Sequence, residues 1–218
     1  MAQLESVHWN FGVAVHNVVI FLGPSLDVAA ARSILPATYL PPIKRGDLSK
    51  LPCDVDVVGI IDGQFYQTLA VSPKEVLELL ARGVDVFGAS SIGALRAAET
   101  HTYGTTGIGE IFRLYRDGII DSDDEVAVTY DPETFRPLSN SLVDIRDALA
   151  AATSMHIIDA HAAEQVVRRM QEVYFPYRSY RLVSQICPAI KSVLRTTRSL
   201  KCQDAMLLLK QIRKAYPV

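Results

Sequence analysis

Residues 72–99 decide the fold, and they read SPKEVLELLARGVDVFGASSIGALRAAE. The first twelve residues predict a helix, because Ser72 suits the N-cap and Pro73 suits the first helical position. Glu75 completes a capping box with Ser72, and Gly83 follows the end of the helix. The apolar run VDVFGA then predicts a buried strand, and IGALRAAE predicts a second helix.

The same alternation occurs in the preceding segments. NVVIFLG (17–23) predicts a buried strand, which is followed by Gly-Pro-Ser and a helix in LDVAAARSIL. VDVVGIIDG (55–63) predicts a second buried strand that ends at Asp-Gly. Buried strands that alternate with helices indicate a parallel sheet in an α/β fold.

The pattern changes after this part of the chain. GIGEIFRLYRDG (107–118) predicts a helix, EVAVTY (125–130) predicts a strand, and the rest is helical in pattern. We therefore expect an α/β fold with a mainly parallel sheet and flanking helices, followed by a helical C-terminal part. Residues 1–150 form the expected core, and residues 151–218 form a helical segment packed on or beside it.

The composition, with 49% hydrophobic and 21% charged residues over 218 positions, suits a globular cytoplasmic protein. No apolar run approaches the length of a membrane span, and residues 1–12 lack the pattern of a secretory signal. The three cysteines are far apart and form neither a disulfide framework nor a CxxC metal pair. We therefore expect no membrane contact and no metal site.

The charge is unevenly distributed. Residues 162–218 contain 11 Lys or Arg against 3 Asp or Glu, a net charge of +8, whereas residues 1–161 carry −10. Such asymmetry often marks a surface for an acidic partner. Alternatively, the basic segment packs on the acidic body of the same chain.

Three strand-to-helix turns contain candidate site residues, and in a parallel sheet all of them lie at the carboxyl edge, where ligands usually bind. The turns are Gly23-Pro24-Ser25, Asp62-Gly63 with the loop to Lys74, and the segment Gly88–Ser91, so Lys74 and Ser91 are expected at the same edge. ASSIG (89–93) fits a relaxed form of the nucleophile elbow, with Ser91 as the nucleophile and Gly93 allowing a close approach. Ser91 equally suits a helix N-cap without any catalytic role.

Lys74 is the candidate base. It occupies the second position of its expected helix, where the positive end of the helix dipole favours a neutral amine. The alternative is a solvated lysine in an ordinary capping box. Arg96 and Glu99 are three residues apart on the next helix and suit an ion pair. No histidine lies in the expected edge loops, so the sequence predicts no Ser–His–Asp triad.

Several stretches together resemble the TfuA-like proteins. They are FLGPSL, PPIKRGD, IIDGQF, the segment 72–99 quoted above, YGTTGIGEIFRLYRDGIIDSDDEVAV and SLVDIRDAL, and they cover about residues 17–150. Ile92 departs from the family pattern, in which we expect methionine.

The resemblance implies a partner of YcaO enzymes in peptide-backbone thioamidation. It implies hydrolysis of a thiocarboxylated ThiS-like sulfur carrier through a serine–lysine pair, with a precursor peptide as indirect partner and with no cofactor and no nucleic acid. The lysine is then Lys74 and the serine Ser91, with Ser90 as the second choice. The expected substrate-binding residues are Gly93, Arg96, Asp62, Ser25 and Glu99.

Two alternatives stay open. The chain could be a non-catalytic adaptor that docks a YcaO enzyme to its peptide. It could also be a rhodanese-like sulfur relay through Cys53, although no cradle of residues surrounds that cysteine in the sequence.

Overall fold

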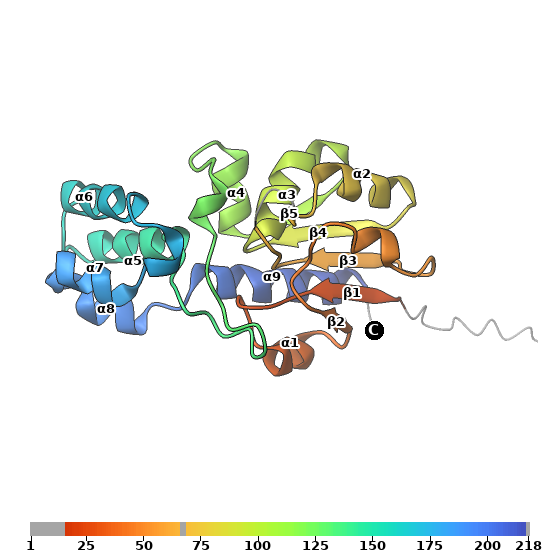
Figure 1. The fold of residues 1–218 in the computed structure, drawn as a ribbon, viewed down its shortest axis with the longest axis horizontal. Coiled ribbons are helices and arrows are strands. Elements are labelled where there is room, and N and C mark those ends of the chain that lie inside the picture. Colours follow the sequence, from red (N-terminus) through yellow and green to blue (C-terminus); the bar gives the residue numbers. More distant parts are fainter. Residues whose placement is uncertain (1–15, 66–68, 217–218) are drawn as a thin grey trace, which may run out of the picture.

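A five-stranded parallel sheet forms the centre of the protein, as seen in a computed structural model that describes residues 16–65 and 69–216 (Figure 1). Helices flank the sheet, and a helical part follows it, so the predicted α/β class is confirmed. Residues 1–12, in which the sequence predicts no secretory signal, lie outside the described residues. Across the described ranges, none of the helices combines the length and the apolar character needed to cross a membrane.

The strands are β1 (Val18–Phe21), β2 (Thr38–Leu40), β3 (Val57–Ile60), β4 (Asp85–Ala89) and β5 (Thr106–Ile108). They lie in the order β2-β1-β3-β4-β5, and every neighbouring pair is parallel. The three strands predicted from the sequence, β1, β3 and β4, are thus confirmed. The chain order reverses between β1 and β3, and the crevice at such a reversal is where open parallel sheets bind ligands.

Helices cover both faces of the sheet. On one face, α1 (Val28–Ile34) and α9 (Leu200–Ala215) share an apolar core with the sheet, while α2 (Pro73–Ala81) and α3 (Ile92–Thr100) pack on the other face. Strand side chains alternate between the two cores, as the pleat requires. The predicted capping box of α2 is present, since Ser72 and Glu75 exchange side-chain and backbone hydrogen bonds.

A helical lobe lies beside the sheet. It contains α5 (Leu142–Ser154), α6 (Ala160–Gln171), α7 (Tyr180–Ile186) and α8 (Lys191–Thr196), which enclose an apolar core of their own (Figure 1). After α8 the chain returns to the sheet as α9. The C-terminal segment 151–218 therefore includes lobe helices and also the helix that covers one face of the sheet.

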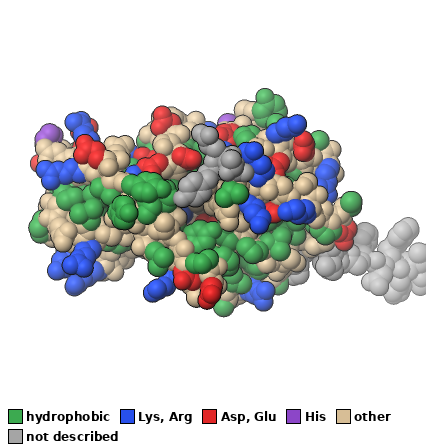
Figure 2. All heavy atoms as spheres, in the orientation of Figure 1, with side chains coloured by type: hydrophobic (Ala, Val, Ile, Leu, Met, Phe, Trp, Pro, Cys, Tyr) green, Lys and Arg blue, Asp and Glu red, His purple; other side chains and the backbone are tan. Residues whose placement is uncertain are grey.

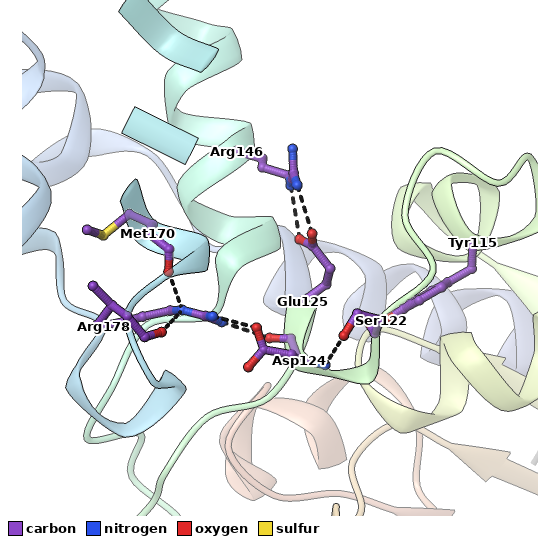
Figure 3. A network of polar contacts seen from close by, with 8 residues as sticks. Tyr115, Ser122, Asp124, Glu125, Arg146, Met170 and Arg178 are labelled. Atoms are coloured by element: carbon purple, nitrogen blue, oxygen red, sulfur yellow. Dashed lines mark hydrogen bonds and ion pairs between the residues drawn. The ribbon is translucent and has the colours of Figure 1, made fainter. Parts of the chain in front are cut away.

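A network of polar contacts joins the lobe to the core (Figure 3). The fully buried Arg178 donates from Nε to the carbonyl of Met170 at 2.9 Å and from Nη1 to the carbonyl of Asp124 at 2.9 Å. Its Nη2 also pairs with the Asp124 carboxylate. Beside it, Arg146 makes a bidentate pair with Glu125, with N···O distances of 2.8 and 2.9 Å. The contacts of Arg178 and Arg146 thus fix the orientation of the lobe relative to the core.

Two elements differ from the prediction. The helix expected at 107–118 is shorter, because β5 extends to Ile108 and α4 (Glu110–Arg116) begins only after Gly109, whose φ of 94° breaks the helical path. The strand expected at 125–130 is wrong. Val126 lies in the buried core near α4 and its carbonyl accepts a hydrogen bond from Lys201 instead of pairing in a sheet.

Candidate functional site

Three polar side chains from different turns form a buried hydrogen-bonded chain at the carboxyl edge of the sheet. Ser90 donates its hydroxyl to Ser25 Oγ at 2.8 Å, and Ser25 donates its hydroxyl to Asp62 Oδ1 at 2.6 Å. All three residues are buried. The turns after β1, β3 and β4 thus meet at this edge because the strands are parallel and adjacent.

The Asp62 carboxylate is fixed by further contacts. Its Oδ2 atom accepts hydrogen bonds from the backbone N–H groups of Gly23 and Ser25, at 2.9 and 3.0 Å. Both carboxylate oxygens are therefore engaged by the turn after β1. Asp62 still lines a cavity at this edge, so the turn holds a negative group against the cavity wall.

The two serines before α3 differ in backbone geometry and surroundings. Ser90 has a φ of 69°, in the left-handed region that residues other than glycine seldom occupy. A strained residue between a strand and a helix is typical of a nucleophile elbow. Ser91 stands at the N-cap of α3, but its side chain makes no capping hydrogen bond. Ser91 instead lines the cavity, so a purely capping role does not account for it.

The cavity has a volume of about 390 Å³, which is within the usual size range of small-molecule sites. Its lining joins the edge turns to the segment after η3 (Asp123–Glu125) and includes Pro24, Asp62, Phe65, Ser91, Thr129 and Tyr130. A second cavity of about 480 Å³ adjoins it, since Gln64, Tyr130 and Pro132 line both. Figure 2 shows hydrophobic side chains gathered over the middle of one face of the molecule.

Backbone N–H groups at the start of α3 are only partly engaged. The N–H of Ser91 donates to Ala89 and Ile61, and the N–H of Gly93 makes a long contact of 3.4 Å with the carbonyl of Ile61. The N–H of Ile92 has no hydrogen-bond partner among the residues described. In a nucleophile elbow the N–H that follows the nucleophile contributes to the oxyanion hole, and for Ser91 that group belongs to Ile92.

Gly93 serves the packing of α3 on the sheet. A Cβ atom at this position would lie 1.8 Å from the carbonyl oxygen of Ile60 in β3. The helix can therefore approach the strand this closely only with glycine here. That contact faces the sheet, and Gly93 is not among the cavity-lining residues.

Lys74 is an exposed residue near the start of α2. Its Nζ is 3.7 Å from Glu78 Oε1 along α2, and its side chain is 85% exposed. Within the described ranges it makes no hydrogen bond with Ser90 or Ser91. The expected ion pair of Arg96 with Glu99 is present in α3, and Arg96 Nε also donates to the carbonyl of Val71 at 2.6 Å. Neither member of this pair lines the cavity.

A different lysine is buried where α9 packs against the segment after η3. Lys201, at the second position of α9, is buried and donates from Nζ to the carbonyl of Val126 at 2.8 Å. Burial lowers the pKa of its amine, while the negative charges of Asp62 and Asp144 oppose that shift. Sequence reasoning missed this residue, although Ser199 before it gives the same helix-start signal that drew attention to Lys74.

Asp144 connects this lysine to the lobe. Its carboxylate accepts hydrogen bonds from the hydroxyls of Ser141 at 2.7 Å and Ser199 at 3.0 Å, and from the N–H of Lys201 at 3.2 Å. The beginnings of α5 and α9 are thus tied together. Because of this tie, the lobe fixes the position of the Lys201 backbone.

Tyr130 stands at the junction of the two cavities. Burial, reinforced by the negative charge of Asp62, raises the pKa of its phenol. Cys53 is exposed and lines neither cavity. Among the described residues, no three His, Cys, Asp or Glu side chains are grouped so that they could hold a metal ion.

Comparison with known proteins gives one family. Residues 62–179 match the family model described as TfuA-like protein, and this range includes Asp62, Ser90 and Ser91. A comparison with curated proteins finds no matching relative. The matched range covers more than half of the 218 residues, and the chain therefore belongs to the family of TfuA-like proteins.

Proposed function

We propose that this protein assists a YcaO enzyme in peptide thioamidation by hydrolysing the C-terminal thiocarboxylate of a ThiS-like sulfur carrier. Membership of the TfuA-like family supports the YcaO partnership. The observation that carries the hydrolase proposal is Ser91, which lines a cavity beside Asp62 without capping its helix. A serine held at a strand-to-helix turn is the arrangement that acyl-transfer enzymes use.

The proposed reaction uses the serine as a nucleophile. The Ser91 oxygen bonds to the thiocarboxylate carbon, the carbon–sulfur bond breaks, and hydrosulfide leaves with the serine proton. The N–H of Ile92 is the candidate donor to the oxyanion that forms on the way. Water then hydrolyses the ester, so that thiocarboxylate and water give carboxylate and hydrogen sulfide.

Ser90 is the second candidate nucleophile. Its backbone strain supports it, whereas its hydroxyl is fully buried and already donates to Ser25. We propose that Ser90 instead holds the turns of this edge together through its hydrogen bonds to Ser25 and, through Ser25, to Asp62. This division of roles predicts a larger loss of sulfide release for a Ser91 variant than for a Ser90 variant, because only Ser91 bonds to the substrate.

The proton acceptor needs a neutral amine, and two lysines are candidates. Lys201 is supported by its burial, by its lowered pKa and by its position at the start of α9, where the helix dipole disfavours a positive charge. Lys74 is supported by the family resemblance and by its place at the start of α2, while its exposed ion pair with Glu78 counts against it. We propose Lys201 as the base and Lys74 as the alternative.

The shape of the edge supports a polypeptide tail as the substrate. The two adjoining cavities offer room for a reacting end next to Ser91 and for preceding residues beyond Tyr130. Pro41, Pro42 and Pro52 line the second cavity, which suits an extended chain. Lys44 can attract a negative charge there, whereas Lys50 is paired with Asp47. We propose that the carrier tail lies along this path.

The test is sulfide release from a thiocarboxylated carrier, measured for the wild type and for single alanine variants of Ser90, Ser91, Lys74 and Lys201. We expect the rate of sulfide release to fall by about a thousandfold or more in Ser91→Ala and Lys201→Ala. In Lys74→Ala the rate should stay within about threefold of the wild-type rate. Thermal unfolding of each variant separates lost chemistry from lost folding. Equal rates in all five proteins would leave only the adaptor function, in which the chain docks a YcaO enzyme to its peptide.

A further inference from the structure

A second site of interest is a cavity that lies away from Ser91. It has a volume of about 740 Å³ and runs between β5, α4 and α9. It shares no lining residue with the cavity that contains Ser91. A molecule bound here would therefore leave the serine site open.

One wall of this groove is the edge of the sheet. β5 pairs with β4, in the register Gly88 with Gly107, and no strand of the described chain pairs with its other side. An edge strand presents unpaired N–H and carbonyl groups to any extended chain that reaches it. Gly107, Ile108 and Gly109 all line the groove, so the backbone of β5 borders it directly.

The side chains of the groove favour an acidic ligand. Four cationic side chains line it, Arg113, Arg116, Arg198 and Lys210, against two acidic ones, Glu110 and Asp204. Both oxygens of Asp204 are occupied by the N–H groups of Glu110 and Ile111 at the start of α4. The net charge that a ligand in the groove would meet is thus positive.

Two of these four cationic side chains form no ion pair with another described residue, and the other two do. Arg113 pairs with Glu110, and Arg116 pairs with Asp117. Arg198 and Lys210, which belong to the basic segment 162–218, make no ion pair with any other residue that the structure describes. Phe112, Met206 and the half-exposed Leu207 supply apolar surface between them.

We propose that this groove binds an extended acidic peptide segment, which adds to β5 as a sixth strand between α4 and α9. Main-chain hydrogen bonds to β5 supply the affinity that any extended chain would share. Arg198 and Lys210 select acidic side chains on one side of the peptide, and the apolar residues receive the alternate side chains. This binding function is additional to the proposed hydrolysis.

The probe is a fluorescein-labelled octapeptide of alternating glutamate and valine, and its binding to the whole protein is measured by fluorescence anisotropy. We expect saturable binding that weakens as salt is raised. A peptide with lysine in place of glutamate tests the charge preference. A glutamate–valine peptide with N-methyl groups on alternate amides tests the strand pairing, because methylation removes the donors. We expect both changes to weaken binding by about tenfold or more.

The double variant Arg198→Glu with Lys210→Glu is expected to weaken binding of the glutamate–valine peptide by about tenfold or more. The matched control is Lys191→Glu with Arg195→Glu, an equal charge change on α8 outside the groove. The control should bind as the wild type does. Hydrogen exchange at residues 106–109 should slow when the peptide is present.

Several results would overturn this proposal: no binding of the acidic peptide, equal binding of the N-methylated peptide, or equal losses in the two double variants. Sulfide release separates it from the hydrolase proposal. We expect the Arg198 and Lys210 variant to release sulfide at the wild-type rate, since these residues lie outside the Ser91 cavity. A loss of sulfide release with unchanged peptide binding would instead assign the groove to the carrier.

Discussion

The hydroxyl of Ser25 donates a 2.6 Å hydrogen bond to Oδ1 of Asp62, which joins the turn after β1 to the turn after β3. These two strands are neighbours at the point where the strand order of the sheet reverses. The bond closes the floor of the crevice that such a reversal creates. Ser91 follows the adjacent strand β4 as the N-cap of α3, so the geometry of this crevice governs the proposed chemistry.

Asp62→Asn tests that floor. An amide offers only one acceptor oxygen, whereas Asp62 accepts from three donors of the turn after β1 on its two oxygens. At least one buried donor then faces an NH₂ group, which costs about 1–3 kcal/mol of unfolding free energy. We expect this loss in urea unfolding, together with slower sulfide release. Asp56→Asn, at an exposed carboxylate, is the control and should change neither quantity.

Lys201→Met separates a catalytic from a structural lysine. Methionine fills a similar volume without a buried charge, so the unfolding free energy should change by less than about 2 kcal/mol. Sulfide release should nevertheless fall by about a hundredfold or more, because methionine cannot accept a proton. The exposed Lys191→Met serves as the control in both measurements. Full sulfide release by a folded Lys201→Met protein would contradict Lys201 as the base and favour Lys74.

The parts of the site that follow from local patterns could be predicted from the sequence. Apolar runs ending at Gly-Pro-Ser, Asp-Gly and Ala-Ser-Ser are sufficient to place Ser25, Asp62 and Ser91 at one edge once the sheet is parallel. The capping box at Ser72 is equally local. These features depend on residues that are close together in the chain.

The remaining features depend on distant residues. Lys201 reaches the carbonyl of Val126 only because the chain leaves the core, forms the lobe and returns as α9, and no local pattern encodes that path. The stretch 125–130 is rich in residues that favour strands, yet the carbonyl of Val126 accepts a hydrogen bond from Lys201. The choice of Lys201 over Lys74 as the proposed base likewise rests on tertiary burial, which the position of a residue in its helix does not reveal.

Arg178→Met tests the attachment of the lobe. The substitution leaves the carbonyls of Met170 and Asp124 and the Asp124 carboxylate without their buried cation. Because the Asp124 carboxylate is 38% exposed, the main cost is the buried carbonyls left without a donor, about 1–3 kcal/mol of unfolding free energy. Denaturant unfolding should show this loss, and hydrogen exchange in α5 and α7 should accelerate. The exposed Arg181→Met is the control, and a comparable loss there would contradict the assigned role.

The buried carboxyl of Asp204 should make the free energy of unfolding depend on pH. Burial raises the pKa of its carboxyl to about 6 in the folded protein, against the partial opposition of two backbone hydrogen bonds. Because the folded state holds this proton more tightly than the unfolded chain, the stabilisation is complete below pH 4 or so and is lost as the pH rises through about 6. The wild type should lose about 3 kcal/mol over that window relative to Asp204→Asn. Urea unfolding of both proteins across the window measures the difference, and parallel curves would refute the assignment.

Helix α9 is the last of the described elements to be synthesised, yet its apolar side chains cover the face of a sheet whose strands all precede the lobe. During translation that face stays open until the lobe and α9 have left the ribosome. Of the two cores of the sheet, only the one on this face waits for α9, because α2 and α3 complete the other. A growing chain of this protein is consequently exposed to aggregation or to chaperone capture for most of its synthesis.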